Sequence, residues 1–93
     1  MDIEVLYFAE FKDITGKDSE KFNLSNPGIL DLVNLLFEKY NSIKNLIWDE
    51  NLNRLKLDVS IAINNEITSK KDDLTSELSN GDKIAFLLPI SGG

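Results

Sequence analysis

The sequence carries one group whose position is suited to chemistry, the free carboxylate that follows Gly92-Gly93. Two residues without side chains make a tip narrow enough to enter a tunnel, and they leave the last carbonyl carbon open to attack. With glycine at about 7% of residues, two together at a chain end are expected by chance in roughly one protein in 200, although paired glycines are also common in frayed ends. Because a carboxylate is inert until it is activated, for example as an acyl-adenylate, we predict that Gly93 is a substrate offered to another enzyme.

The residues before this tip favour an extended tail. The ring of Pro89 fixes φ and discourages a helix, so the chain is expected to leave its last strand extended. The segment from Leu87 to Gly93 reads L-L-P-I-S-G-G, apolar first and slender at the end. We therefore expect residues 89–93 to be a flexible functional tail on a single domain of residues 1–93.

The composition removes most of the residues that catalysis needs. The chain has no cysteine and no histidine, so it lacks thiolate nucleophiles, disulfides, the commonest general base and the commonest metal ligand. We expect no bound cofactor and no metal site. The protein is therefore predicted not to be an enzyme on its own, and its catalytic groups are expected on its partners.

The charge of the chain narrows the classes of partner. Sixteen acidic residues against ten basic ones give a net charge of −6, which repels nucleic acid and anionic membranes. The first apolar run is too short and too acidic for a signal peptide, and no stretch approaches the length of a membrane span. These features favour a cytoplasmic protein whose protein partners present basic residues.

The elements that must position the tail follow from periodicity. Alternation of Ile3, Val5 and Tyr7 predicts a first strand, and residues 20–24 a short partner strand. A helix is expected to start near Ser25-Asn26-Pro27, with Ser25 or Asn26 as N-cap and the proline in its first turn, and to run to about Tyr40. Its predicted buried stripe is Ile29, Leu32, Val33, Leu36 and Tyr40.

The second half of the chain predicts the rest of a sheet. Residues 41–57 have no clear period and are expected to form a loop with possible helical turns. Residues 58–63 predict a strand, Asn64-Asn65 a tight hairpin and residues 66–68 its return. After a polar stretch anchored by Leu74 and Leu78, a turn at residues 80–82 leads into a last strand at residues 83–88. This order predicts an α+β fold, and with the first and last strands parallel it is a ubiquitin-like β-grasp: a mixed sheet crossed by one main helix, with an extended C-terminal Gly-Gly tail.

Three other motifs are weaker. Gly16-Lys17 resembles the end of a phosphate-binding loop, but the other positions of that motif are not matched, so a turn is favoured. The carboxylate pairs Asp49-Glu50 and Asp72-Asp73 are expected to be solvated surface. Trp48 is expected to be a core plug or lid rather than a stacking platform.

Strand alternation also predicts an exposed apolar face. If Val5 and Tyr7 face the helix, then Leu6 and Phe8 face away. By the same alternation Ile84, Phe86 and Leu88 face inward, and Ala85 and Leu87 face out. Phe8 and Leu87 are then expected to share one face, which is either a binding patch or a second core layer.

Two segments of the chain resemble a known family. Residues 4–16 read E-V-L-Y-F-A-E-F-K-D-I-T-G and residues 81–93 read G-D-K-I-A-F-L-L-P-I-S-G-G. They resemble the small subunit of molybdopterin synthase, MoaD, in which a first strand ends in Phe-Ala and the chain ends Gly-Asp-x-Val-Ala-Phe-x-Pro-Pro-Val-Ser-Gly-Gly. One departure is Leu88, which stands where the family usually has the first of two prolines.

The resemblance implies a β-grasp sulfur carrier. Gly93 would be adenylated by a MoeB-like adenylyltransferase that uses ATP, and then converted to a thiocarboxylate with sulfur from a donor protein. The tail would insert into a MoaE-like large subunit, where its sulfur is delivered to cyclic pyranopterin monophosphate in molybdenum cofactor biosynthesis. Phe8 and Leu87 match apolar positions at the subunit interface. The residues that would thread into the partner are Leu87, Leu88, Pro89, Ile90, Ser91 and Gly92.

Three alternatives remain open from the sequence. The chain is also compatible with a ThiS-like thiamine sulfur carrier, which has the same fold and Gly-Gly end. A ubiquitin-like modifier joined to lysines through Gly93 would need the same activation of the carboxylate. A β-grasp interaction module would not use the tail at all.

Overall fold

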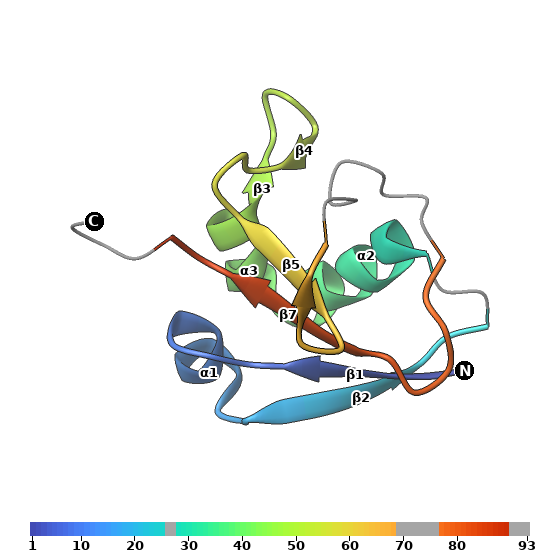
Figure 1. Cartoon of the computed structure of the whole chain (residues 1–93). Helices are drawn as coiled ribbons and strands as arrows, with labels where there is room; N and C mark the ends of the chain where they lie inside the picture. The colour runs from blue at the N-terminus through green and yellow to red at the C-terminus, as the bar shows by residue number, and fades with distance from the viewer. Residues whose placement is uncertain (26–27, 69–76, 90–93) are drawn as a thin grey trace.

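The computed structural model describes residues 1–25, 28–68 and 77–89, and a five-stranded mixed sheet lies at its centre (Figure 1). The strands lie in the order β2-β1-β7-β5-β6, and β3 and β4 form a separate two-stranded sheet. In chain order the elements are β1 (Asp2–Leu6), α1 (Glu10–Thr15), β2 (Ser19–Asn23), α2 (Ile29–Lys39), α3 (Asn41–Ile47), β3 (Trp48–Asp49), β4 (Arg54–Leu55), β5 (Ser60–Ile63), β6 (Glu66–Ile67) and β7 (Lys83–Leu87).

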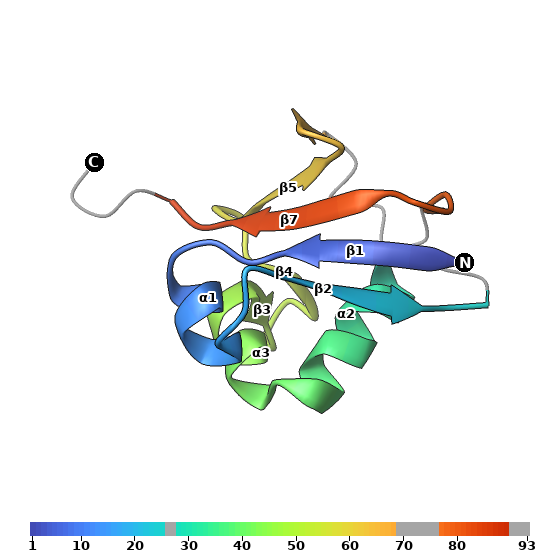
Figure 2. The same cartoon turned by 90° about the horizontal axis from the view of Figure 1, so that it is seen from below.

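The strands β1 and β7 are parallel neighbours in the middle of the sheet. Glu4 lies opposite Lys83, and Leu6 lies opposite Ala85. β2 extends the sheet on one side and β5 on the other, each antiparallel to its neighbour. Figure 2 shows α2 and α3 together on one side of β1 and β7. The fold is therefore the predicted ubiquitin-like β-grasp, with α2 as its main helix.

Helix α2 packs on the sheet through side chains at three- and four-residue spacings, as predicted. Ile29, Leu32, Val33 and Leu36 are each at most 1% exposed, and burial of a side chain of this size stabilises the fold by about 1.5–3 kcal/mol. Tyr40 is the C-cap of the helix and is half-buried. The fully buried side chains on the sheet side of this core are Ile3, Val5, Ile61 and Ile84.

The start predicted for this helix was wrong. The N-cap is Gly28, whose N–H donates to Oδ2 of Asp31 at 3.0 Å. Glycine is an acceptable N-cap, and the carboxylate three residues later supplies the side-chain bond while it complements the helix dipole. Ser25 therefore does not cap the helix, and Asn26-Pro27 lies outside the described residues.

A short helix and a hairpin occupy residues 41–55, within the segment for which a loop with possible helical turns was expected. In α3 the side chains of Ile43 and Ile47 lie about one turn apart and are both buried. The hairpin of β3 and β4 follows and pairs Trp48 with Leu55. The expected helical turns are present as α3, whereas the hairpin was not predicted, because strands of two residues are too short to show an alternation.

A helix that was not predicted, α1, begins shortly after the first strand. It is anchored by Phe11, which is 3% exposed. Gly16 ends the helix with φ 72°, and its N–H donates to the carbonyl of Lys12 at 2.8 Å. Gly16-Lys17 is therefore part of a turn, as predicted, and not of a phosphate-binding loop.

The predicted turns around β5 and β7 are confirmed. Asn64 and Asn65 have φ of 52° and 72°, the left-handed pair that a two-residue hairpin requires, and β6 returns after them. Gly81 has φ 87° in the turn before β7. Leu78 is buried at 4% exposure, as expected of an anchor, whereas Leu74 lies outside the described residues.

Trp48 and its neighbours make contacts that stabilise the fold. Its half-buried ring lies edge-on to Phe37 at 5.8 Å between centroids and packs against the core. The carboxylate of Asp49 accepts backbone N–H groups within the β3–β4 turn. Glu50 forms an exposed ion pair with Lys44 at 3.3 Å. These contacts match the expectation of a core plug next to solvated carboxylates.

Candidate functional site

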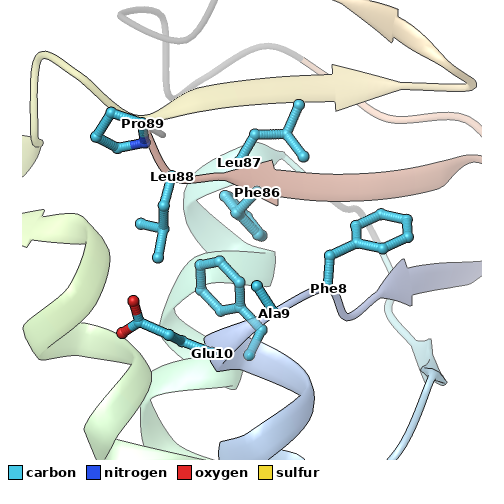
Figure 3. Close-up of a pocket in the computed structure, with 8 residues that line it drawn as sticks. Phe8, Ala9, Glu10, Phe86, Leu87, Leu88 and Pro89 are labelled. Carbon is cyan, nitrogen blue, oxygen red and sulfur yellow. The ribbon is translucent and has the colours of Figure 1, made fainter. Parts of the chain in front are cut away.

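The ends of β1 and β7 bring the two segments of interest together. Because the strands are parallel, the residues that follow them emerge at the same edge of the sheet. There they enclose a cavity of about 300 Å³, which we call the tail-root hollow. Its lining residues are Phe8, Ala9, Glu10, Phe11, Phe86, Leu87, Leu88 and Pro89 (Figure 3).

The side chains at this edge face as the strand alternation predicted. Tyr7 is 3% exposed, whereas Phe8 is 51% exposed. Phe86 is buried and Leu88 packs against the core, while Leu87 is half-buried. Figure 3 shows Phe8 and Leu87 on one side of their strands and Phe86 and Leu88 on the other. The structure thus brings Phe8 and Leu87 together on the face away from the main helix.

An apolar row continues from these residues across the outer face of the sheet. Leu6 pairs with Ala85, so the two side chains lie on one face. Ala62 pairs with both Ala85 and Ile67, which carries the row to the edge strand. Ile67 is 69% exposed, while Ala85 is only 5% exposed because its methyl group is small and lies between neighbouring strands. We call this set the outer apolar patch; its members are Leu6, Phe8, Ala62, Ile67, Ala85 and Leu87.

The predicted tail is described only at its root. Ile90, Ser91, Gly92 and Gly93 lie outside the described residues. Leu88, which departs from the family pattern, is half-buried and packs against the core. This position therefore supplies an apolar anchor at the tail root, where a proline would supply stiffness.

The corner between β1 and α1 is strained, which the sequence did not predict. Ala9 has φ 50° and ψ −122°, a backbone conformation that usually requires glycine. The N–H of Phe11 donates to the carbonyl of Phe8 at 3.0 Å and closes the turn around it. A residue held this way costs of order 1–3 kcal/mol, so the surrounding structure must over-determine the corner. The strain lies directly between Phe8 and Glu10.

A carboxylate behind this corner fixes the end of β1. Oε1 of Glu20 accepts the hydroxyls of Tyr7 at 3.0 Å and Tyr40 at 2.8 Å. Its Oε2 accepts Nζ of Lys17 at 3.1 Å and Nζ of Lys39. We call this set, Tyr7, Lys17, Glu20, Lys39 and Tyr40, the Glu20 network. It ties β2 and the end of α2 to Tyr7, the residue that follows β1.

Ionisation in this network follows from its contacts. Burial opposes the charge of Glu20, but the hydrogen bonds from Lys39, Tyr40, Lys17 and Tyr7 outweigh it and lower the pKa of Glu20 to about 2. Burial and the bond to Glu20 raise the pKa of Tyr7. Glu20 is therefore a fixed anion and Tyr7 a fixed donor. Neither has the titration behaviour of a general acid or base near neutral pH.

Neither a cluster of metal ligands nor a membrane-spanning helix is present in the described parts of the chain. Across residues 1–25, 28–68 and 77–89, no three His, Cys, Asp or Glu side chains come together in a way that could hold a metal ion. Asp72-Asp73 lies outside these ranges. Of the helices in the described parts of the chain, none is long and apolar enough to span a membrane.

The sequence pointed to Phe8, Leu87 and the tail but missed other parts of this site. Ile67 carried a signal, since it is the one large apolar residue in the predicted return strand. For Glu10 the only signal in the sequence was its position directly after Phe8-Ala9. Glu20 carried none, because its partners come from distant positions in the sequence.

Solved structures of low sequence identity share this fold along their whole length. SAMP1 from Haloferax volcanii matches with a TM-score of 0.83 at 18% identity, and 100% of each chain is covered. SAMP1 from Methanosarcina acetivorans, a small archaeal modifier protein, matches with a TM-score of 0.81 at 24% identity, over 99% of this chain and 96% of that one. A chain from the complex of subunits 1 and 2 of molybdopterin-converting factor from Helicobacter pylori matches with a TM-score of 0.58 at 25% identity, over 100% of both chains.

A family model gives the assignment. The model of the ThiS family matches residues 5–93, which include both segments at the tail-root hollow and the Gly-Gly end. The β-grasp fold, the parallel pair of β1 and β7 and this match agree. The chain belongs to the ThiS family of small, non-catalytic sulfur carriers.

Proposed function

We propose that this protein is the sulfur-donating small subunit of a molybdopterin synthase. The carboxylate of Gly93 attacks ATP on a MoeB-like adenylyltransferase, which gives an acyl-adenylate and releases pyrophosphate. A donor then supplies sulfur at the sulfide level, which attacks the acyl carbon, displaces AMP and leaves a thiocarboxylate. The thiocarboxylate tail enters a MoaE-like large subunit, where its sulfur bonds to cyclic pyranopterin monophosphate and water cleaves the acyl C–S bond, which restores the Gly93 carboxylate.

The observation that carries the proposal is the place of the tail root. Pro89 leaves the sheet at the edge where Phe8 and Leu87 of the outer apolar patch lie. Contiguous exposed apolar surface marks interaction sites, and an exposed aromatic ring is a typical anchor. A partner that covers this patch would hold the tail at a fixed point, so that the carboxylate is presented in one place.

The catalytic groups for activation and sulfur transfer belong to the partner proteins in this proposal. The described residues offer a docking surface at the root of the tail, and the lowered pKa of Glu20 and the raised pKa of Tyr7 make neither group suited to acid–base catalysis near neutral pH. Positioning alone can contribute much of a rate enhancement, because a misplacement of about 1 Å can cost a hundredfold in rate. The molybdopterin pathway is supported by the resemblance of residues 81–93 and by the Helicobacter pylori complex.

The test is mass analysis of the C-terminus. The purified protein is incubated with the activating enzyme, ATP and a sulfur donor, and then with the large subunit and cyclic pyranopterin monophosphate. Replacement of one oxygen by sulfur at Gly93, followed by its loss as molybdopterin forms, is the expected result. A thiocarboxylate that only a thiamine-pathway acceptor consumes would identify a thiamine carrier. An isopeptide bond to lysine would identify a modifier, and an unchanged end an interaction module.

A further inference from the structure

The tail-root hollow combines apolar walls with a single charge. Of its lining residues Glu10 alone is ionisable, and Phe8, Phe86, Leu87 and Leu88 supply large apolar surfaces. Figure 3 shows the Glu10 carboxylate on the Leu88 side of the hollow. Its volume, about 300 Å³, is at the lower limit of ligand pockets, which run from roughly 300 to 1,000 Å³. The hollow is therefore of a size to take a protruding side chain.

The charge of Glu10 is not compensated within the described parts of the chain. No hydrogen bond or ion pair there reaches its carboxylate, and the residue is exposed. The neighbouring charges are already paired: Lys12 contacts Asp18 at 2.7 Å, beside a second hollow on the Leu6 side of Phe8. Lys12 is therefore engaged elsewhere, and Glu10 remains available to a group from outside.

A strained backbone residue holds Phe8 and Glu10 in their positions. Ala9, between Phe8 and Glu10, keeps its strained φ of 50°. Strain of this kind is found where the surrounding structure uses it, and here it sets the exposed ring and the carboxylate on either side of one corner. This is independent of the composition of the hollow, and it marks the same site.

We propose that the tail-root hollow receives an arginine or lysine side chain of the partner that takes up the tail. The apolar stem of that side chain lies against Phe8 and Leu88, and its cationic head pairs with Glu10. The inference rests on the proposed function, because it needs a partner at the tail root.

Physical chemistry favours a cation over a purely apolar side chain. An apolar residue that filled the hollow would bury the Glu10 carboxylate without a partner, and an unpaired buried charge is costly. Long cationic side chains place an apolar stem on apolar surface while their head group reaches a polar one. A charge-assisted bond is also roughly twice as strong as a neutral one. Against a chain of net charge −6, such a contact adds attraction at the point where the tail enters.

The experiment compares two glutamates by titration calorimetry with the MoaE-like large subunit of the same organism. Glu10→Gln is expected to raise Kd about tenfold, and Glu10→Arg by about a hundredfold or more, since it sets like charges together. Glu38→Gln is the matched control, because Glu38 is an exposed carboxylate on α2 that does not line the hollow. It is expected to change Kd less than twofold. Melting temperatures within error of the wild type exclude a folding defect.

A charge swap identifies the cation. Arginines and lysines of the large subunit are reversed to glutamate one at a time and paired with Glu10→Arg. One of these reversals is expected to restore binding to Glu10→Arg. The same reversal should not improve binding of the wild-type chain. If the wild type binds while Glu10→Gln behaves like Glu38→Gln, or no reversal restores binding, the cation is refuted and the proposed function stands. If the wild type neither binds nor becomes thiocarboxylated, both fail.

Discussion

Glu10 and Glu20 are two carboxylates in one small fold, and their surroundings could hardly differ more. The side chain of Glu20 is 10% exposed and accepts four side-chain donors from three parts of the fold. Glu10 is exposed at the edge of a hollow, beside a strained residue, and no donor among the described residues reaches it. The first has all its interactions in the folded chain, so it serves stability. The second has its interactions still to make, so it serves a partner.

The residues that stabilise the fold and the residues available to a partner are adjacent in the chain. Tyr7 belongs to the Glu20 network, and the next residue, Phe8, belongs to the outer apolar patch. Stability and function can therefore be changed separately by neighbouring substitutions. The following changes test that separation, from the largest expected effect to the smallest.

Changes at Gly93 should abolish function without touching the fold. One alanine added after Gly93 moves the carboxylate about 3.5 Å along an extended chain, and deletion moves it as far the other way. Both should reduce ATP-dependent thiocarboxylate formation by more than about a hundredfold, because the reacting atom is misplaced. The melting temperature should stay within about 1 °C, since no core contact changes. Normal sulfur transfer by the unprocessed, extended chain would contradict this.

Glu20→Gln should have the largest effect on stability. The amide keeps a hydrogen-bond acceptor but loses the charge that Lys17 and Lys39 neutralise, so we expect a loss of about 2–3 kcal/mol in the free energy of unfolding. In a domain of this size that lowers Tm by roughly 10–20 °C, measured by circular dichroism. Glu10→Gln is the control and should stay within about 0.5 kcal/mol. Equal losses for the two variants would remove the contrast.

The lowered pKa of Glu20 also predicts how stability falls at acid pH. The pKa of Glu20 lies at about 2 in the folded protein against an ordinary value of 4.5. A lowered folded-state pKa contributes stability that is complete above the ordinary value and is lost as pH falls through the folded one. Between pH 4.5 and about 2, Glu20→Gln should therefore lose less stability than the wild type. Parallel curves in urea titrations would count against the assigned contacts.

Phe8→Ala should weaken association and leave the fold intact. The ring is half exposed, so its loss removes little core, but an aromatic anchor at an interface is worth about 2 kcal/mol or more. We expect Kd for the large subunit to rise roughly 30-fold, with Tm within about 3 °C. The buried neighbour gives the opposite control: Phe11→Ala should cost about 3–5 kcal/mol of stability. Binding unaffected by Phe8→Ala would show that the outer apolar patch is not the docking surface.

Ala9→Gly should give the smallest effect, and one of unusual sign. Glycine relieves strain of order 1–3 kcal/mol but increases the entropy of the unfolded chain by about 0.5–1 kcal/mol. We expect a net gain in stability of about 1 kcal/mol, within a range of roughly 0–2.5 kcal/mol. Ala62→Gly in β5 is the control and should lose about that amount, because it lies in a regular strand. A loss for Ala9→Gly equal to that of the control would mean that the corner is unstrained.

The parts of the fold that the sequence predicted are those with a repeated local signal. The stripe of Ile29, Leu32, Val33 and Leu36 spans two turns and was recognisable, and Asn64-Asn65 is a direct turn signal. α1 was missed and α3 was expected only as possible helical turns, because these helices bury only one and two apolar side chains, respectively. The start of α2 was misplaced because a strong cap candidate at Ser25 competes with a weak one at Gly28, which Asp31 makes effective.

The candidate site divides in the same way. Phe8 and Leu87 follow from strand alternation, because exposure in a strand has a period of two. The strain at Ala9 and the contacts of Glu20 depend on where the backbone turns and on residues up to 20 positions apart, such as Tyr40. No local pattern encodes such contacts, so they could be found only in three dimensions.

The position of β7 in the sheet has a consequence for how the chain is made. β7 lies between β1 and β5. Glu4 of β1 can pair with its parallel neighbour, Lys83, only after β7 has been synthesised. Without β7 the sheet separates into the pairs β2-β1 and β5-β6, and isolated two-stranded ribbons are marginally stable at best. A ribosome therefore releases a foldable chain only after all the other described elements have been synthesised.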